Sequence, residues 1–125
     1  MRHDEENFQI GVVRALRMAG HFVFAVPNGN RNNPIQGHKY KMMGQMAGVS
    51  DLILLLPERK VFFIELKNPN GKGKQSPSQM EFEDSVKAHG HQYMIWDSWA
   101  QVEQFINAHR KEVGNFMRLG GTNVD

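Results

Sequence analysis

Cysteine is absent from the 125 residues of this chain. Disulfide bonds and thiolate metal sites are therefore excluded. Long apolar runs are also missing, because the longest one is far too short to cross a bilayer. No N-terminal segment has the charged, apolar and small-residue order of a signal peptide. We therefore expect a soluble, cytoplasmic protein with no membrane partner.

A strong excess of charge of one sign is missing as well. The formal net charge is only +2, which points weakly toward nucleic acid. Basic residues dominate from Arg31 to Lys41 and return at Lys72 and Lys74, although an ordinary solvated surface explains them equally well. The length and the apolar fraction of 40% fit one globular domain. We expect that domain to span residues 1–113, followed by a tail over 114–125 that is flexible unless a partner subunit orders it.

Apolar periodicity, capping residues and glycine stops predict a mixed α/β fold. The predicted order is α-β-β-β-α-β-α, which makes a small mixed β-sheet flanked by helices on both faces. The predicted elements are helix 4–19, strand 22–26, strand 52–56, strand 61–66, helix 77–89, strand 93–96 and helix 99–109.

The connection over residues 28–48 has no clear period and is rich in Asn, Gly, Lys and Met. A loop of this length in a small domain is usually functional or mobile, and residues 38–46 could form a short helix within it. Three methionines, Met42, Met43 and Met46, either pack under this loop or form a contact between subunits.

The two apolar runs 52–56 and 61–66 surround a short polar connection and predict an antiparallel hairpin. Since both runs are apolar on both faces, the hairpin should lie in the middle of a covered sheet. Glu65 and Lys67 close the second run on the same side of the strand, with Cα atoms roughly 7 Å apart. Asp51 begins the first run, so the hairpin brings a second carboxylate beside them.

Two carboxylates and a backbone carbonyl make an oxygen-only site that suits Mg²⁺, with Mn²⁺ as a substitute. A lysine beside such a site can orient the attacking water or stabilise charge on a phosphate. This is the chemistry of phosphodiester hydrolysis. The alternative interpretation is a surface salt bridge between Glu65 and Lys67 at a strand end.

The proposed site imposes a condition on the hairpin. A turn centred on Glu58 and Arg59 would pair Asp51 with Leu66 and place Asp51 on the face away from Glu65. The register must therefore shift by one residue, through an odd-length turn or a bulge near Asp51.

Four segments carry a resemblance to a known family: Glu5-Glu6-Asn7-Phe8-Gln9, Val26-Pro27-Asn28-Gly29, Met46-Ala47-Gly48 and the stretch GVSDLILLLPERKVFFIELKNPNGKGKQSPSQMEFEDSVKAHGHQYMIW. With them the chain resembles the virus-type replication-repair nuclease (VRR-NUC) domain of the PD-(D/E)xK nuclease superfamily, most of all its stand-alone phage and prophage versions. The resemblance covers Glu5 to about Ile106 and implies a restriction-endonuclease-like core.

The resemblance implies that Asp51, Glu65 and the carbonyl of Leu66 bind the metal, and that Lys67 is the catalytic lysine. It also implies an acid from the first helix, in direct or water-mediated contact with the metal. The family spacing to Gln9 and the helical face favour Glu5 over Glu6, although acids at a helix start are stabilising in any case.

Two further positions relate to the family pattern. Gln79 matches a glutamine that lies near the site in the family, while its alternative role is to cap the second long helix. Ser50 replaces the usual proline before the first aspartate, a position that shapes the backbone and binds no metal. We also expect phosphate-backbone contacts from Asn28, Arg31, Asn32, Asn33, Lys39, Lys41, Lys72 and Lys74.

These features predict a Mg²⁺-dependent, structure-selective DNA endonuclease. The resemblance implies a homodimer that cuts four-way (Holliday) junctions in the cytoplasm of a bacterial host cell, and an exposed Trp99 or Phe116 would support such a dimer. One alternative is a flap, end or single-strand nicking nuclease that acts as a monomer. A non-catalytic DNA-binding module is a rival of another class, and a small-molecule phosphohydrolase is a more distant one.

Overall fold

The computed structural model describes residues 2–27 and 34–110. The predicted order of elements is confirmed, with one addition inside the long connection, the nine-residue helix α2. This helix begins four residues before the stretch in which the sequence allowed one, and the predicted tail lies outside the described residues. The elements are α1 (Arg2–Met18), β1 (Phe22–Ala25), α2 (Pro34–Met42), β2 (Leu52–Leu56), β3 (Lys60–Leu66), α3 (Pro77–Ala88), β4 (Gln92–Trp96) and α4 (Trp99–Ala108).

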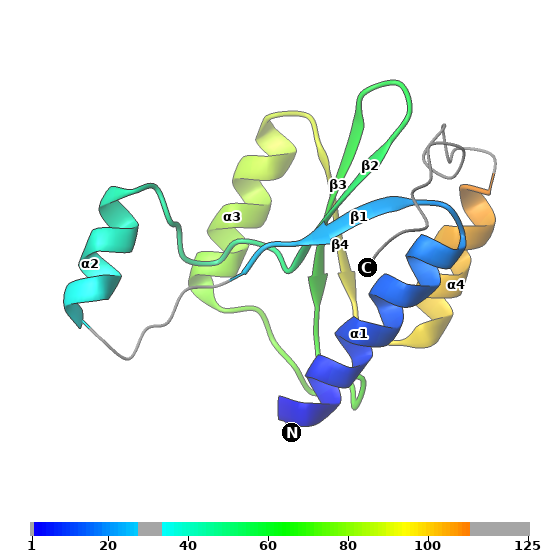
Figure 1. The fold of residues 1–125 in the computed structure, drawn as a ribbon, viewed down its shortest axis with the longest axis horizontal. Helices are drawn as coiled ribbons and strands as arrows, with labels where there is room; N and C mark the ends of the chain where they lie inside the picture. The colour runs from blue at the N-terminus through cyan, green and yellow to red at the C-terminus, as the bar shows by residue number, and fades with distance from the viewer. Residues whose placement is uncertain (1, 28–33, 111–125) are drawn as a thin grey trace.

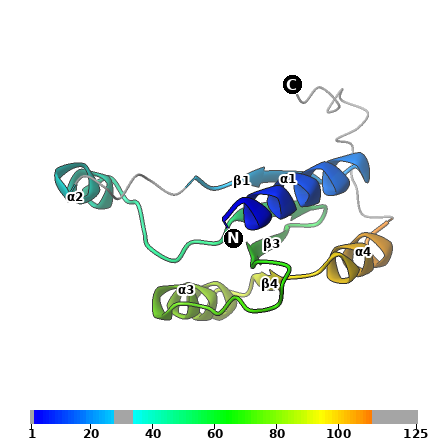
Figure 2. The ribbon, with the colours of Figure 1, turned by 90° about the horizontal axis from the view of Figure 1, so that it is seen from below.

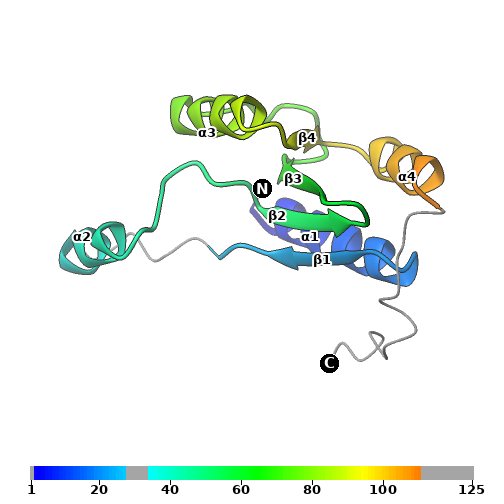
Figure 3. The ribbon, with the colours of Figure 1, turned by 90° about the horizontal axis from the view of Figure 1, so that it is seen from above.

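The four strands form one sheet in the order β1-β2-β3-β4 (Figure 3). The first two pairs are antiparallel, whereas β3 and β4 are parallel, so the sheet is mixed as predicted. The nearly continuous apolar strands β2 and β3 take the two central positions. Their placement follows from side chains that are apolar on both faces.

The helices divide between the two faces of the sheet, with α1 and α4 on one side and α3 on the other (Figures 1 and 2). On the first side, Phe8 and Leu16 of α1 and Phe105 of α4 join one core cluster with alternate residues of the strands, such as Leu54 and Ile64. On the second side, Phe82 of α3 packs edge-to-face against Phe63 and Tyr93. The alternation of the strands thus directs Glu65 and Lys67 toward α3.

On its side of the sheet, helix α3 covers only the half that β3 and β4 form. On the other half Phe22 lies opposite Leu55 in the β1–β2 ladder, and Phe22, Phe24 and Leu55 are all exposed. Helix α2 projects away from the rest of the fold (Figures 1 and 3). Within residues 2–27 and 34–110, no helix combines the length and the apolar character that a membrane span requires.

Candidate active site

The turn between β2 and β3 sets the register that the site requires. Leu56 pairs with Lys60, which leaves three residues in the turn, and two of them, Glu58 and Arg59, have φ near +65°. Because Leu52 pairs with Ile64, the next step along the ladder places Asp51 opposite Glu65. The predicted shift of one residue is confirmed, and an odd-length turn produces it.

A backbone hydrogen bond then fixes Asp51 at the end of β2. The Leu66 amide donates to Asp51 Oδ2 at 2.7 Å. Burial raises the pKa of Asp51 above its ordinary value, and the negative charges of Glu5 and Glu65 raise this pKa further. The Leu66 hydrogen bond and the charge of Lys67 act in the opposite direction.

Glu65 has no exposed surface, and its two oxygens have different surroundings. Oε1 accepts hydrogen bonds from the Tyr93 hydroxyl at 2.7 Å and from Gln75 Nε2 at 2.9 Å. Oε2 lies 3.1 Å from Lys67 Nζ in an ion pair, and within the described part of the chain it has no hydrogen-bond partner. The pair between Glu65 and Lys67 therefore forms inside the protein and not at its surface.

Lys67 is held by two oxygens besides Glu65. Its Nζ donates to Gln79 Oε1 and to the carbonyl of Lys74, each at 2.9 Å. Gln79 Oε1 also accepts from the Ser76 amide at 2.8 Å, which completes a capping box at the start of α3. Both interpretations of Gln79 thus describe the structure, because one oxygen caps the helix and positions the lysine.

Glu5 lies in the first turn of α1 and is half-buried, whereas Glu6 is exposed. Its charge contributes to the raised pKa of Asp51, so the first helix does bring an acid toward the site. Its role toward a metal stays a prediction.

The sequence did not predict the groups that hold Glu65. Gln75 Nε2 also donates to Glu83 Oε1 at 2.9 Å, so one amide links two carboxylates. Tyr93 comes from β4, which is parallel to β3. The one signal in the sequence that pointed to Tyr93 is a hydroxyl at the start of the apolar stretch Tyr93–Trp96, and no signal pointed to Gln75.

The side chains fit a hard divalent cation. The donors are all oxygens, both carboxylates are largely or fully buried, and Glu65 Oε2 is a buried acceptor without a hydrogen bond. No group of three or more His, Asp or Glu side chains suited to a metal occurs among residues 2–27 and 34–110. Asp51 and Glu65 would therefore need oxygens from the backbone, from water or from the substrate to complete the coordination.

The predicted DNA contacts fall into three groups. Asn28, Arg31, Asn32 and Asn33 lie outside the described residues. Lys39 and Lys41 are exposed in the last turn of the projecting α2. Lys72 and Lys74 are exposed on the loop between β3 and α3, where the Lys74 carbonyl contacts Lys67. The last pair is thus the one that lies beside the candidate site.

Comparisons with known proteins agree with this architecture. The VRR-NUC domain profile matches residues 30–109, and the chain therefore belongs to the VRR-NUC family of nuclease domains. A solved structure described as a VRR_NUC domain is 19% identical, with a TM-score of 0.59, over 83% of this chain and 95% of that one. A second, described as a VRR_NUC domain protein, is 19% identical over 88% of each chain, with a TM-score of 0.65. A search of curated proteins gave no match.

Proposed function

We propose that this chain is a Mg²⁺-dependent endonuclease of the PD-(D/E)xK type that hydrolyses phosphodiester bonds in DNA. The observation that carries the proposal is the buried Glu65, which faces Asp51 across the hairpin and leaves one oxygen unbonded beside the ammonium of Lys67. Burying a carboxylate is costly, so a buried cluster of charges at the end of a strand favours function over packing. A non-catalytic DNA-binding module would have no chemical need for all three side chains.

In this proposal Asp51, Glu65 and the carbonyl of Leu66 would hold the cation, with Glu5 acting through water. When bound, Mg²⁺ would supply positive charge that stabilises the phosphate in the transition state. Lys67 donates to Gln79 and to the carbonyl of Lys74, and these two hydrogen bonds hold its ammonium beside Glu65 Oε2, where the substrate phosphate would bind. Lys67 would therefore orient the attacking water or stabilise charge on the phosphate.

We further propose branched DNA as the substrate, with a homodimer cutting opposite strands of a four-way junction. A two-fold dimer presents two sites to a two-fold junction, which is the geometric basis of this choice. The exposed apolar face of β1 and β2 supports association between copies, because contiguous apolar surface on a soluble protein commonly marks an interface. Exposed lysines at Lys72 and Lys74 provide phosphate contacts beside the site.

The test is cleavage of labelled junction, flap, duplex and single-stranded DNAs with Mg²⁺ or Mn²⁺. Lys67→Ala should slow cleavage by about 100- to 1,000-fold, the usual effect of removing one group that stabilises transition-state charge. Lys60→Ala, at the opposite end of the same strand β3, is the matched control and should cut like the wild type. The mechanism is wrong if the wild type leaves every DNA intact or if Lys67→Ala cuts as fast as Lys60→Ala.

A further inference from the structure

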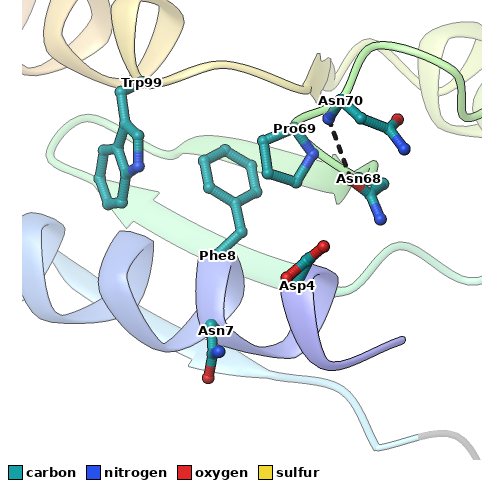
Figure 4. A pocket seen from close by; sticks show the side chains of 7 residues that line it. All are labelled: Asp4, Asn7, Phe8, Asn68, Pro69, Asn70 and Trp99. Atoms are coloured by element: carbon teal, nitrogen blue, oxygen red, sulfur yellow. Dashed lines mark hydrogen bonds between the residues drawn. The ribbon is translucent and has the colours of Figure 1, made fainter. Parts of the chain in front are cut away.

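A pocket of about 440 Å³ opens beside the candidate active site (Figure 4). It lies between the start of α1, the loop that follows β3 and the first residue of α4. It is lined by three apolar residues, Phe8, Pro69 and Trp99, and by four polar ones, Asp4, Asn7, Asn68 and Asn70. Pockets that bind small molecules measure roughly 300–1,000 Å³, so the space suits a group of that class.

One wall of the pocket is an aromatic ring held in place from behind. Trp99 packs edge-to-face on the buried Phe8, with ring centroids 5.3 Å apart and an interplanar angle of 85°. A Cβ atom added at Gly11 would lie 2.9 Å from the Trp99 ring, so the ring packs directly on the helix backbone. Even so, 46% of Trp99 is exposed. A fixed and exposed indole is a ready surface for stacking another planar group.

The polar lining favours a nucleobase over a phosphate. Among the described residues that line the pocket there is no Lys or Arg, and Asp4 brings a carboxylate that would repel a phosphate. The side chains of Asn68 and Asn70 carry NH2 donors that match the acceptors on the edges of bases, while their Oδ1 atoms accept from the backbone amides of Asn70 and Lys72. The hydrogen bond from the backbone amide of Asn70 to Asn68 Oδ1, 2.9 Å long, holds this loop in a defined shape (Figure 4).

The pocket also adjoins the residues of the candidate site in sequence. Asn68 follows Lys67 directly, and Asp4 precedes Glu5. A nucleotide whose phosphate reached Lys67 would therefore have this aromatic pocket close to its base or to that of a neighbour.

We propose that the pocket binds an unpaired nucleobase next to the scissile phosphate, stacked on Trp99 and hydrogen-bonded by the asparagines. The inference rests on the proposed action on DNA and deepens it. It names the substrate class as DNA with an unpaired or extruded nucleotide at the cleavage position, as occurs at branch points and flaps. Base stacking on aromatic side chains tolerates every base, so selectivity would be for structure and not for sequence.

The experiment is a double-mutant cycle between protein and DNA, measured by fluorescence anisotropy without divalent metal. Two flap DNAs differ only in that the single-stranded arm carries bases or abasic sites. For the wild type, the abasic arm should weaken binding about tenfold. Trp99→Ala should weaken binding to the base-carrying arm by a similar factor and leave the abasic arm unchanged, while Trp99→Phe should restore most of the loss.

Asn70→Ala is a second variant in an exposed loop, and it should also weaken only the base-carrying arm. The proposal is overturned if the wild type binds both arms equally, or if Trp99→Ala and Asn70→Ala weaken both arms alike. Light scattering that shows Trp99→Ala turning a dimer into a monomer, with both arms weakened equally, would assign Trp99 to a subunit contact and also overturn it.

Cleavage by the wild type with Mg²⁺ separates this inference from the proposed function. A protein that cuts the panel but shows no coupling in the cycle refutes the pocket alone. A protein that cuts nothing but shows the coupling refutes the proposed nuclease and supports the pocket.

Discussion

Glu65 is the residue around which the site is built, and its burial is unfavourable unless its charge is compensated. Tyr93 and Gln75 compensate one oxygen, and Lys67 compensates the other. The two oxygens thus have separate tasks, since one is fixed by hydrogen bonds and the other faces the lysine. Burial and the neighbouring Glu65 raise the pKa of Tyr93, so its hydroxyl stays protonated and remains a donor.

Tyr93→Phe should therefore loosen Glu65 while leaving all charges in place. We expect cleavage to slow by about 10- to 100-fold, the usual effect of removing a group that orients a metal ligand. The Mg²⁺ concentration for half-maximal rate should rise as well, which a purely structural defect would not cause. Tyr40→Phe, at the other tyrosine of the chain, is the control. An unchanged Mg²⁺ titration for Tyr93→Phe would contradict this role.

The burial of the ionised Asp51 side chain lowers the stability of the folded protein. Since burial raises its pKa above the ordinary value of 3.8, ionisation is less favourable in the folded than in the unfolded chain. Stability is therefore lost as the pH rises from the ordinary value through the raised pKa, and the full penalty is present above both. Cleavage, which needs the ionised form, should fail on acidification at a higher pH than an ordinary aspartate would cause.

Asp51→Asn should lower the cleavage rate by at least about 100-fold, because it removes a proposed metal ligand. It should also increase the free energy of unfolding at pH 7 relative to the wild type, with the gain shrinking toward pH 3.5. Urea unfolding at both pH values measures this, with the exposed Asp84→Asn as control. A variant that is less stable than the wild type at pH 7 would contradict the assigned cost.

At the scale of elements, the start of α3 connects three parts of the site. Its capping box places Gln79 where it also binds Lys67. Gly48, just before Asp51, packs against the same helix start, since a Cβ atom there would lie 2.3 Å from the Ser78 carbonyl oxygen. Gly48 also has φ +83°, a conformation that side chains disfavour.

Gly48→Ala should displace the start of α3 and with it Gln79. Gly44→Ala is a matched control because Gly44 has φ +107°, and beyond its chain neighbours no atom of the described residues lies within 4 Å of an added Cβ. Both variants carry backbone strain of about 1–3 kcal/mol, but only Gly48→Ala adds a collision. We expect Gly48→Ala to show the greater loss in thermal unfolding and a lower cleavage rate. Equal losses would mean that the close approach has no energetic role.

At the scale of the whole molecule, two groups of apolar side chains are exposed to solvent. One is the β1–β2 face with Phe22, Phe24 and Leu55, which α3 leaves uncovered. The other is at the end of α2, where Met42 and the following Met43 are 76% and 72% exposed. Of the two alternatives predicted for these methionines, packing under the loop is therefore wrong, and a contact between subunits stays a prediction. A nine-residue helix is marginal alone in water, which favours stabilisation of α2 by a further contact.

We therefore expect the protein to be a dimer in size-exclusion chromatography with light scattering. Phe24→Glu should lower the mass to that of a monomer, because it places a charge on the β1–β2 face. Met18→Glu, at an exposed apolar residue at the end of α1, is the control and should stay dimeric. A monomeric wild type would contradict the dimer, and a dimeric Phe24→Glu would exclude this face as its contact.

Much of the structure of the central hairpin could be predicted from the local sequence pattern. Alternation along a strand places Glu65 and Lys67 on one side, and two doubly apolar runs belong in the middle of a sheet. The chemistry proposed for Asp51 then required a register shift that an odd-length turn or a bulge can supply, and the structure has the odd-length turn. Local periodicity determines such features because it sets the direction in which each side chain points.

The surroundings of that hairpin were decided by tertiary structure alone. Tyr93 is 28 residues from Glu65 and Gln75 is 10, and no period in the sequence links them. The same is true of the pocket, which Phe8 and Trp99 form across more than ninety residues of chain. A sequence pattern specifies faces and turns, but which distant faces meet depends on how the helices pack onto the sheet. The sequence thus determined the strand that carries the carboxylate and the lysine, and packing determined what holds them and what lies beside them.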